Sequence, residues 1–287
     1  RTPHPAPRTG GSMPARHCVF IDFDGTFAAH GVAPPQHADA VRRARSAGHT
    51  VLLCTGRPAS IVAPDVAELF DGMVASAGAY VRVGTDVLRD TRFPQELGRR
   101  SVEILQGHGV AFALEAPEAL YCTPETAARI RAGVGSPQPG LAGGVGRGPQ
   151  DIVDAARTPA DLASCSFAKI SLWGSPVRVE QLAEEIGPEV GALPNSIAQD
   201  DTSSGELHLR EIDKADGLRQ VAGHLGIDLT ATVGIGDGMN DLGMVRAAGT
   251  GVVIHGAPAA LREAADLEVP GPAEHGVLIA FERLGLL

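Results

Sequence analysis

The chain has 287 residues and a formal net charge of −10, from 24 Lys and Arg against 34 Asp and Glu. This acidic balance, without a dense cluster of Lys or Arg, argues against a nucleic-acid-binding surface, so an anionic substrate must be attracted locally. A chain of this length can bury one large or two smaller hydrophobic cores, and we expect two domains. The sequence has no apolar stretch of about 18 residues to span a bilayer, and we expect a cytoplasmic protein without a membrane partner.

The cysteines and histidines give little support to redox or zinc chemistry. The four cysteines are Cys18, Cys54, Cys122 and Cys165, and no two of them have CxxC spacing. Cys18 and Cys54 lie in apolar runs, where a thiol packs as a small hydrophobe, so we expect all four to be reduced and non-catalytic. The ten histidines form no HxxxH or HExxH pattern of the kind that binds zinc.

The first eighty residues alternate between short apolar runs and helical patterns. A segment rich in Pro, Arg and Gly precedes them at 1–16, and we expect it to be a disordered tail. The predicted elements are strands at 18–21, 51–54 and 73–75, a helix through Val41 and Ala44 that ends at Gly48, and a helix around 60–70. This βαβαβ order predicts half of a doubly wound, mostly parallel sheet.

The C-terminal part completes that sheet. The spacing i, i+3, i+4, i+7 of four apolar residues predicts a helix through Leu218, Val221, Ala222 and Leu225. Strands at 232–235 and 251–254 and a closing amphipathic helix at 277–284 follow. We therefore predict an α/β fold with a catalytic core formed by residues 17–80 and 206–287.

Between these two parts, at 81–205, the pattern predicts an inserted α+β cap domain. Its strand candidates, at 168–173 and 204–209, are short and amphipathic, as expected of a sheet with one solvated face. We expect Leu172 and Trp173 to lie in the hydrophobic core of this domain. The stretch at 133–149 is rich in Gly and Pro, which predicts a surface loop, with a mobile flap over a substrate as the alternative.

Two acidic segments follow two of the predicted core strands. Asp22-Phe23-Asp24-Gly25-Thr26 follows the first strand, and 237–241 follows the strand at 232–235. Because the carboxyl ends of parallel strands share one edge of a sheet, these carboxylates are expected to converge on one site. Carboxylates without His or Cys suit a hard divalent cation such as Mg²⁺, which also binds substrate phosphate oxygens. The sequence therefore predicts a Mg²⁺-dependent enzyme that acts on phosphate.

Other interpretations of the same residues have less support. A calcium-binding loop starting at Asp22 would need a Glu at its twelfth position, where Ala33 stands. A dinucleotide loop at 234–239 would need a small residue in place of Met239, and Asp237 would repel a pyrophosphate. A simple polar turn at 237–241 explains that segment equally well when it is taken alone.

The order of four short motifs resembles the haloacid dehalogenase-like (HAD) phosphohydrolase superfamily. These motifs are DxDGT at 22–26, TGR at 55–57, an isolated Lys214 and GDxxND at 236–241. The likeness is to the Cof-type branch, which carries an α/β cap inserted after the third core strand, and it covers about 19–80 and 209–287. The sequence departs from that branch at 76–79, where Ser-Ala-Gly-Ala replaces the usual Asn-Gly.

The motifs and the resemblance together assign roles to particular residues. Asp22 is the expected nucleophile, and Asp24, on the same face of an extended segment, is the expected general acid and base. The resemblance implies Mg²⁺ held by Asp22, Asp237 and the backbone of Asp24. The residues expected to bind the substrate phosphate are Gly25, Thr55, Gly56, Lys214 and Asn240, with Asp241 and Arg57 in supporting roles.

The expected activity is hydrolysis of a small phosphomonoester, such as a sugar phosphate, through an aspartyl-phosphate intermediate. A sugar phosphomutase and a non-catalytic ligand-binding protein remain the alternatives. Tyr80, Arg82 and Lys169 are candidate contacts to the leaving group, and the cap is expected to move about crossings near Tyr80 and Gly205. The sequence leaves the substrate and the oligomeric state open.

Overall fold

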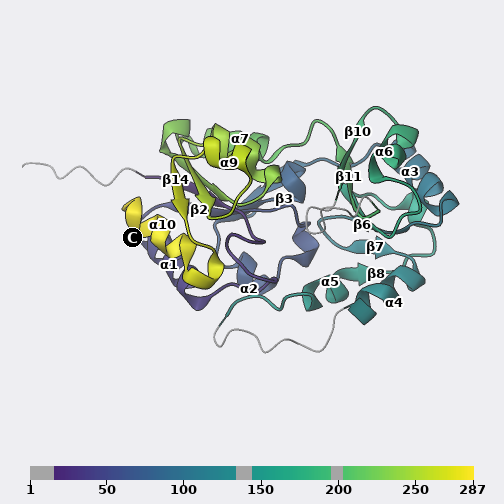
Figure 1. Ribbon diagram of the computed structural model, residues 1–287, viewed down its shortest axis with the longest axis horizontal. Helices are drawn as coiled ribbons and strands as arrows, with labels where there is room; N and C mark the ends of the chain where they lie inside the picture. Colours follow the sequence, from purple (N-terminus) through teal and green to yellow (C-terminus); the bar gives the residue numbers. More distant parts are fainter. Residues whose placement is uncertain (1–15, 134–143, 195–202) are drawn as a thin grey trace, which may run out of the picture.

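The computed structural model describes residues 16–133, 144–194 and 203–287. Figure 1 shows two lobes, one containing both the first and the last elements of the chain and the other containing the middle of it. The predicted disordered tail lies outside the described residues except for Arg16, and so does most of the Gly/Pro-rich stretch at 133–149.

An eight-stranded sheet forms the first lobe. Its strands are, in spatial order, β14 (Leu267–Val269), β13 (Thr250–Ile254), β12 (Thr232–Gly236), β1 (Cys18–Ile21), β2 (Thr50–Cys54), β3 (Gly72–Ala75), β4 (Tyr80–Val83) and β5 (Asp86–Asp90). The first six are parallel, and β4 and β5 are antiparallel to their neighbours. In the centre, β1 pairs with β12 on one side and β2 on the other. The predicted mostly parallel, doubly wound sheet is confirmed.

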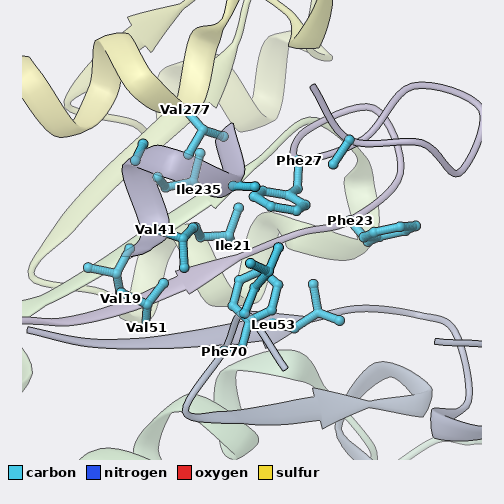
Figure 2. Packing of buried hydrophobic residues seen from close by; sticks show 14 of the residues in the cluster. Val19, Ile21, Phe23, Phe27, Val41, Val51, Leu53, Phe70, Ile235 and Val277 are labelled. Atoms are coloured by element: carbon cyan, nitrogen blue, oxygen red, sulfur yellow. The ribbon is translucent and has the colours of Figure 1, made fainter. Parts of the chain in front are cut away.

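Helices cover both faces of this sheet, and the alternation of side chains along β1 explains how. Val19 and Ile21 face the cluster in Figure 2, which also contains Val41 of α1 and Val277 of α10. Phe20 faces the opposite cluster, with α7 and α8. A strand buried on both sides has to be apolar throughout, and each large side chain so buried contributes ~1.5–3 kcal/mol. The helices of this lobe are α1 (Pro35–Ser46), α2 (Pro64–Ala67), α7 (Lys214–Leu225), α8 (Leu242–Ala247), α9 (Ala259–Glu263) and α10 (Gly276–Arg283).

The helix predicted around 60–70 is wrong in its extent. The chain there forms a 3-10 helix at Ala59–Ile61 and then the short helix α2, which begins at Pro64. Proline has no N–H to donate within a helix but fits the first helical position, so it ends one helix and starts another. Further 3-10 helices lie at Ser76–Gly78, Leu162–Ser164, Leu229–Ala231, Met239–Asp241 and Pro272–Glu274.

A six-stranded sheet forms the second lobe. Its strands are, in spatial order, β10 (Val190–Pro194), β11 (Gly205–Leu209), β9 (Lys169–Trp173), β6 (Ala111–Glu115), β7 (Leu120–Cys122) and β8 (Ala156–Arg157). All neighbours are antiparallel except β7 and β8. Two helices, α3 (Gln95–Gly107) and α6 (Val179–Ile186), pack on one face of it through a separate hydrophobic cluster. On the other face, α4 (Pro124–Gly133) and α5 (Gln150–Ala155) lie beside β6, β7 and β8.

The boundary between the two sheets does not fall at the residues where the sequence pattern changes. We expected the inserted domain to cover 81–205, but β4 and β5 extend the eight-stranded sheet to Asp90, and β11 belongs to the six-stranded sheet. The hairpin of β4 and β5 is short and amphipathic because it lies at a sheet edge, so its pattern resembles that of the cap strands. The chain therefore crosses between the sheets after Asp90 and after Leu209.

Two expectations about single side chains have opposite outcomes. Leu172 lies in the cluster under α3 and α6, as predicted, but Trp173 is 39% exposed and outside that core. Successive residues of a strand face opposite sides of its sheet, so these neighbours could not both be buried under the same helices.

The four cysteines are free thiols, and burial raises the pKa of Cys18 to about 12, which makes it a poor nucleophile at neutral pH.

Candidate active site

The segment after β1 forms a tight turn at the carboxyl edge of the sheet. The Asp22 N–H donates to the carbonyl of Ile235 in β12 (2.9 Å), and the Phe27 N–H donates back to the carbonyl of Asp22 (3.1 Å). Gly25 has a φ of +87°, and a side chain there would overlap the carboxylate of Asp237. The turn therefore needs glycine because two acidic loops meet at this point.

The central contact of the site joins a buried cation to two buried carboxylates. The Lys214 Nζ, at the start of α7, lies 2.6 Å from Asp22 Oδ1 and 2.6 Å from Asp241 Oδ1. Asp213 begins this helix by accepting the N–H of Ala215 (2.6 Å), which fixes where Lys214 starts. The sequence separations are 192 and 27 residues, so only the folded sheet brings these groups together.

Burial and mutual charge shift the ionisation of this cluster. Burial raises the pKa of Asp22, Asp241 raises it further, and Lys214 opposes both effects. Burial by itself would lower the pKa of Lys214, but Asp22 and Asp241 outweigh it and raise that pKa. A nucleophilic carboxylate in such a place needs cations around it to stay ionised, and one of them is already present as Lys214.

Three carboxylates form a group that fits a hard metal ion. Asp22, Asp237 and Asp241 each offer an oxygen, and these oxygens lie within 4.8 Å of one another. Thr26 donates its hydroxyl to Asp237 Oδ1 (2.8 Å), and burial raises the pKa of Asp237. A donor set of oxygens alone, without His or Cys, suits Mg²⁺ or a similar ion.

Asp241 differs from the other two because its oxygens are already used. Its Oδ1 contacts Lys214, and its Oδ2 accepts the N–H groups of Asp237 and Gly238, both at 3.0 Å. These bonds fix the loop after β12 and the position of the ammonium group. The contact of Asp241 with Lys214, which the sequence analysis gave as a supporting role, is therefore present in the structure.

Asp24 and Arg57 form a bidentate ion pair beside this cluster. The Arg57 Nε and Nη2 each lie 2.6 Å from an oxygen of Asp24, and the guanidinium lies 4.7 Å from the ring centre of Phe23. Such paired contacts with a guanidinium are among the stronger charge-assisted hydrogen bonds. The Asp24 side chain is therefore held by Arg57 and does not belong to the group of three carboxylates.

The turn after β2 carries the other predicted phosphate ligands. The buried Thr55 accepts the Arg57 N–H on Oγ1 (3.0 Å) and uses its own N–H in the sheet, with Val74 (2.8 Å). Asn240 is exposed, with its Nδ2 next to Gly56. The N–H groups of Gly25 and Thr55 are therefore both used within the protein, since the Gly25 N–H donates to the carbonyl of Ala28 (2.9 Å). Among the described residues no acceptor holds the hydroxyl hydrogen of Thr55, which remains for a ligand.

Three consecutive residues with positive φ connect this turn to Lys214. Ser76, Ala77 and Gly78 have φ values of 48°, 55° and 113°, which cost ~1–2 kcal/mol each for the two that are not glycine. The Ser76 N–H donates to the Arg57 carbonyl (2.8 Å), and a side chain at Gly78 would overlap the backbone of Asp213. The strained segment packs between the β2 turn and α7, at the position where the sequence departs from the Cof-type branch that it resembles.

Each of the three candidate leaving-group residues contacts other groups of the protein. Lys169 is buried, and its Nζ contacts the Gly56 carbonyl (2.8 Å), Glu206 Oε1 (2.8 Å) and Glu115 Oε2 (3.1 Å). Its ammonium therefore already has a carbonyl and two carboxylates as partners. Arg82 donates to the Gly84 carbonyl in the β4–β5 turn, and Tyr80 packs against the hydrophobic cluster of the first lobe.

Glu115 and Glu206 are two further residues at this place that the sequence patterns did not predict. Both lie on strands next to β9, with Glu115 directly opposite Lys169 and Glu206 opposite Ser171. The hydroxyl of Ser171 donates to Glu115, so one polar row crosses three strands. The available signal was an acidic residue within each short apolar run, but the pairing of these strands is not readable from the sequence.

Comparison with known proteins agrees with this geometry. The profile of the haloacid dehalogenase-like hydrolases matches residues 19–281, which is most of the chain. The chain belongs to this family. The predicted family, the α/β fold with a cap and the hydrolase class are confirmed, and phosphatase activity on a small phosphate substrate is the activity that the family and its named members support.

Relatives of this hydrolase cover nearly its whole length. It is 26% identical to the Bacillus subtilis protein YkrA over 278 residues, covering 94% of this chain and 98% of YkrA. It is 25% identical to the 5-amino-6-(5-phospho-D-ribitylamino)uracil phosphatase YwtE of Bacillus subtilis, covering 93% and 97%. The solved structure of the subclass IIB sugar phosphatase BT4131 has a TM-score of 0.71 at 21% identity, covering 94% of this hydrolase and 100% of that chain. Within the described parts of the hydrolase, none of the helices has the length and apolar character needed to cross a membrane.

Proposed function

We propose that this hydrolase cleaves a small phosphomonoester, with sugar phosphates as the leading substrate class, through an aspartyl-phosphate on Asp22. The observation that carries the proposal is the Lys214 ammonium, buried 2.6 Å from both Asp22 and Asp241. A carboxylate nucleophile divides one difficult displacement into two easier ones, and a fixed cation beside it attracts the phosphoryl group. The likeness to a sugar phosphatase supports the substrate class.

Asp22 and Asp24 divide the chemistry between them. An Asp22 oxygen bonds to phosphorus while the bond from phosphorus to the leaving-group oxygen breaks, and Asp24 donates a proton to that oxygen. Asp24 then takes a proton from the water that attacks phosphorus, the bond to Asp22 breaks, and phosphate leaves. Because Arg57 holds both oxygens of Asp24, one of these contacts has to be exchanged for the leaving-group oxygen.

Asp22 and Asp237 would hold the Mg²⁺ ion, with the backbone carbonyl of Asp24 as the further ligand that the family resemblance implies. When bound, the ion would offset the repulsion between the phosphate dianion and Asp22. Asp241 contributes by holding Lys214 and the loop after β12, since its oxygens accept three hydrogen bonds.

The remaining residues would bind the phosphate oxygens. The hydroxyl of Thr55 and the ammonium of Lys214 approach from buried positions, and Asn240 approaches from the exposed side of Gly56. The turn at Gly56 would supply a backbone amide. These groups act by orienting the phosphoryl group and by stabilising the charge that develops during transfer.

We also infer that the two lobes are a core domain and a cap domain. The crossings after Asp90 and after Leu209 would let the cap open to admit water and substrate and close during transfer. Four free cysteines fit a reducing compartment, which supports a cytoplasmic location.

The decisive experiment measures phosphate release from a panel of phosphorylated sugars and polyols, with Mg²⁺ or with EDTA. We expect release that needs the metal and that disappears in Asp22→Asn. Asp86→Asn, an exposed aspartate at the start of β5, is the matched control and should keep full activity. Equal release from the Asp22→Asn protein would contradict the nucleophile, and transfer to a second position of the sugar without free phosphate would indicate a mutase.

A further inference from the structure

Glu206 lies next to the phosphate-binding turn although it belongs to the other lobe. Its Oε1 lies 2.8 Å from Lys169 Nζ, and the same Nζ lies 2.8 Å from the carbonyl of Gly56. Two short contacts therefore connect Glu206 to the residue after Thr55. Its side chain is 35% exposed, and among the described residues no hydrogen bond reaches its second oxygen.

The strand register shows which side chains share the face of Glu206. Glu206 lies opposite Ser171 on β9 and opposite Leu193 on β10, and directly paired residues point to the same side of a sheet. Lys169 and Trp173 are two residues on either side of Ser171 and share this face as well. Leu193 is 41% exposed, so this face presents an aromatic ring and an aliphatic side chain around one open carboxylate.

The helices leave this part of the face uncovered. On the opposite face α3 and α6 pack over Ile170 and Leu207. On the face of Glu206, α4 packs over β6 and β7, where Ala127 contacts Cys122, and α5 contacts Leu120. The half formed by β9, β11 and β10 carries the contact of Lys169 with the Gly56 carbonyl in the turn after β2.

The net formal charge around the substrate position is negative. The cations are Lys214, Arg57 and Lys169, and their carboxylate partners are Asp22, Asp241, Asp24, Glu115 and Glu206. Asp237 adds another carboxylate. Bound Mg²⁺ and a phosphate dianion would cancel each other, so the excess would persist in the loaded site.

The histidine on this face does not supply a compensating charge. His208 lies opposite Lys169, and its ring lies over Gly191 on the neighbouring strand. Burial lowers its pKa, Lys169 and Arg210 act in the same direction, and Glu206 opposes them. The ring is therefore neutral at pH 7.

We propose that Glu206 determines specificity: it favours leaving groups that carry an ammonium group beside hydroxyls and rejects those that carry a carboxylate or a second phosphate. Trp173 and Leu193 would contact the carbon skeleton of such a leaving group. The inference rests on the proposed function, because a leaving group meets this face only when its phosphate lies at Asp22. Like charges brought together in a site with excess negative charge repel, and opposite charges attract.

The test uses three esters of one framework: glucosamine 6-phosphate, glucose 6-phosphate and 6-phosphogluconate. We expect kcat/KM to fall in that order, by about tenfold at each step, since ~1.4 kcal/mol corresponds to a factor of ten. Glu206→Gln should reduce the ratio between the first and third esters by about tenfold or more and change the neutral ester least. Glu206→Asp keeps the charge and should restore the order, and Glu263→Gln, an exposed glutamate of α9, should leave all three values unchanged.

The outcomes separate this inference from the proposed function. Metal-dependent hydrolysis with no preference between the three esters, or with the anionic ester preferred, would overturn the role of Glu206 and leave the phosphatase assignment intact. If neither these esters nor any other member of the panel is hydrolysed, the proposed function fails. Calorimetric dissociation constants of the same esters for the Asp22→Asn protein then decide the inference, because binding in the order amine, neutral, anionic supports it and any other order rejects it.

Discussion

Lys214 and Lys169 are both buried between two carboxylates, but they belong to different lobes and have different partners. Both carboxylates of Lys214 are buried and come from the catalytic lobe, and both contacts are 2.6 Å. Lys169 pairs with buried Glu115 and with half-exposed Glu206, and its third contact crosses to Gly56. The first arrangement is complete within one lobe, and the second depends on how the lobes meet. We therefore propose that one lysine takes part in the reaction and that the other controls the fit of the cap.

The largest effect should come from Lys214→Met. It leaves two buried carboxylates without their cation, which should lower the free energy of unfolding by about 3–5 kcal/mol. Phosphate release should fall by about 10³-fold, because a preorganised charge at the reacting group is lost. Denaturant unfolding and steady-state kinetics measure the two effects. A folded variant with unchanged kcat would remove Lys214 from the reaction.

Lys169→Met should have a smaller effect on stability and a different kinetic signature. Glu206 is partly solvated and can lose its partner at little cost, so we expect a loss of about 2–3 kcal/mol, mainly from Glu115. The turn at Gly56 also loses its contact with the cap, so kcat/KM should fall by about tenfold through misplacement of the phosphate ligands. Kinetic losses as large as those of Lys214→Met would erase the distinction between the two lysines.

Acid should weaken the catalytic lobe through a group on the other face of its sheet. The His37 ring contacts the Phe27 carbonyl through Nδ1 (2.8 Å) and accepts the Val277 N–H on Nε2 (3.3 Å), so both nitrogens are used by the neutral ring. Burial lowers the pKa of His37 from 6.5 to about 4. The unfolded chain therefore binds a proton on His37 more tightly than the folded chain does. The stabilisation that the neutral ring contributes to the fold is complete above pH 6.5 and is lost as the pH falls towards 4.

The free energy of unfolding of the wild type, measured by denaturant, should fall by about 2 kcal/mol between pH 7 and pH 4.5 because of this histidine. His37→Gln should be less stable at pH 7 and should show a flatter slope over the same range. Lys169→Met, with its change in the other lobe, should keep the wild-type slope from this histidine. The same slope in His37→Gln and the wild type would assign the acid sensitivity to the carboxylates around the two lysines.

The smallest effect should come from a second contact between the lobes, which involves neither lysine. Val145 forms two backbone hydrogen bonds with Ala33, and the next residue, Gly146, donates its N–H to Asp65 Oδ2 (3.0 Å). Asp65→Ala removes one exposed acceptor and should cost about 1 kcal/mol in unfolding free energy. Its kcat should stay within about twofold of the wild type. A larger kinetic effect than that of Lys169→Met would show that this contact, and not Lys169, controls the fit of the cap.

The sequence by itself determined the catalytic half of this comparison. The apolar runs at β1 and β12 and the acidic segments after them predicted that Asp22 and Asp237 would meet at one sheet edge, and they do. The contacts of Lys214 with Asp22 and Asp241 agree with the predicted motif order. This was possible because buried parallel strands have a recognisable pattern and their carboxyl ends must share an edge.

Only the tertiary structure decided the other half. The partners of Lys169 come from two neighbouring strands and from a turn 113 residues away, and no periodicity in the sequence specifies which strands pair. The same holds for the clamp of Arg57 on Asp24, and for the edge hairpin whose solvated face resembled a cap strand. Local patterns record which face of an element is buried, whereas ion pairs and domain boundaries depend on which elements later come together.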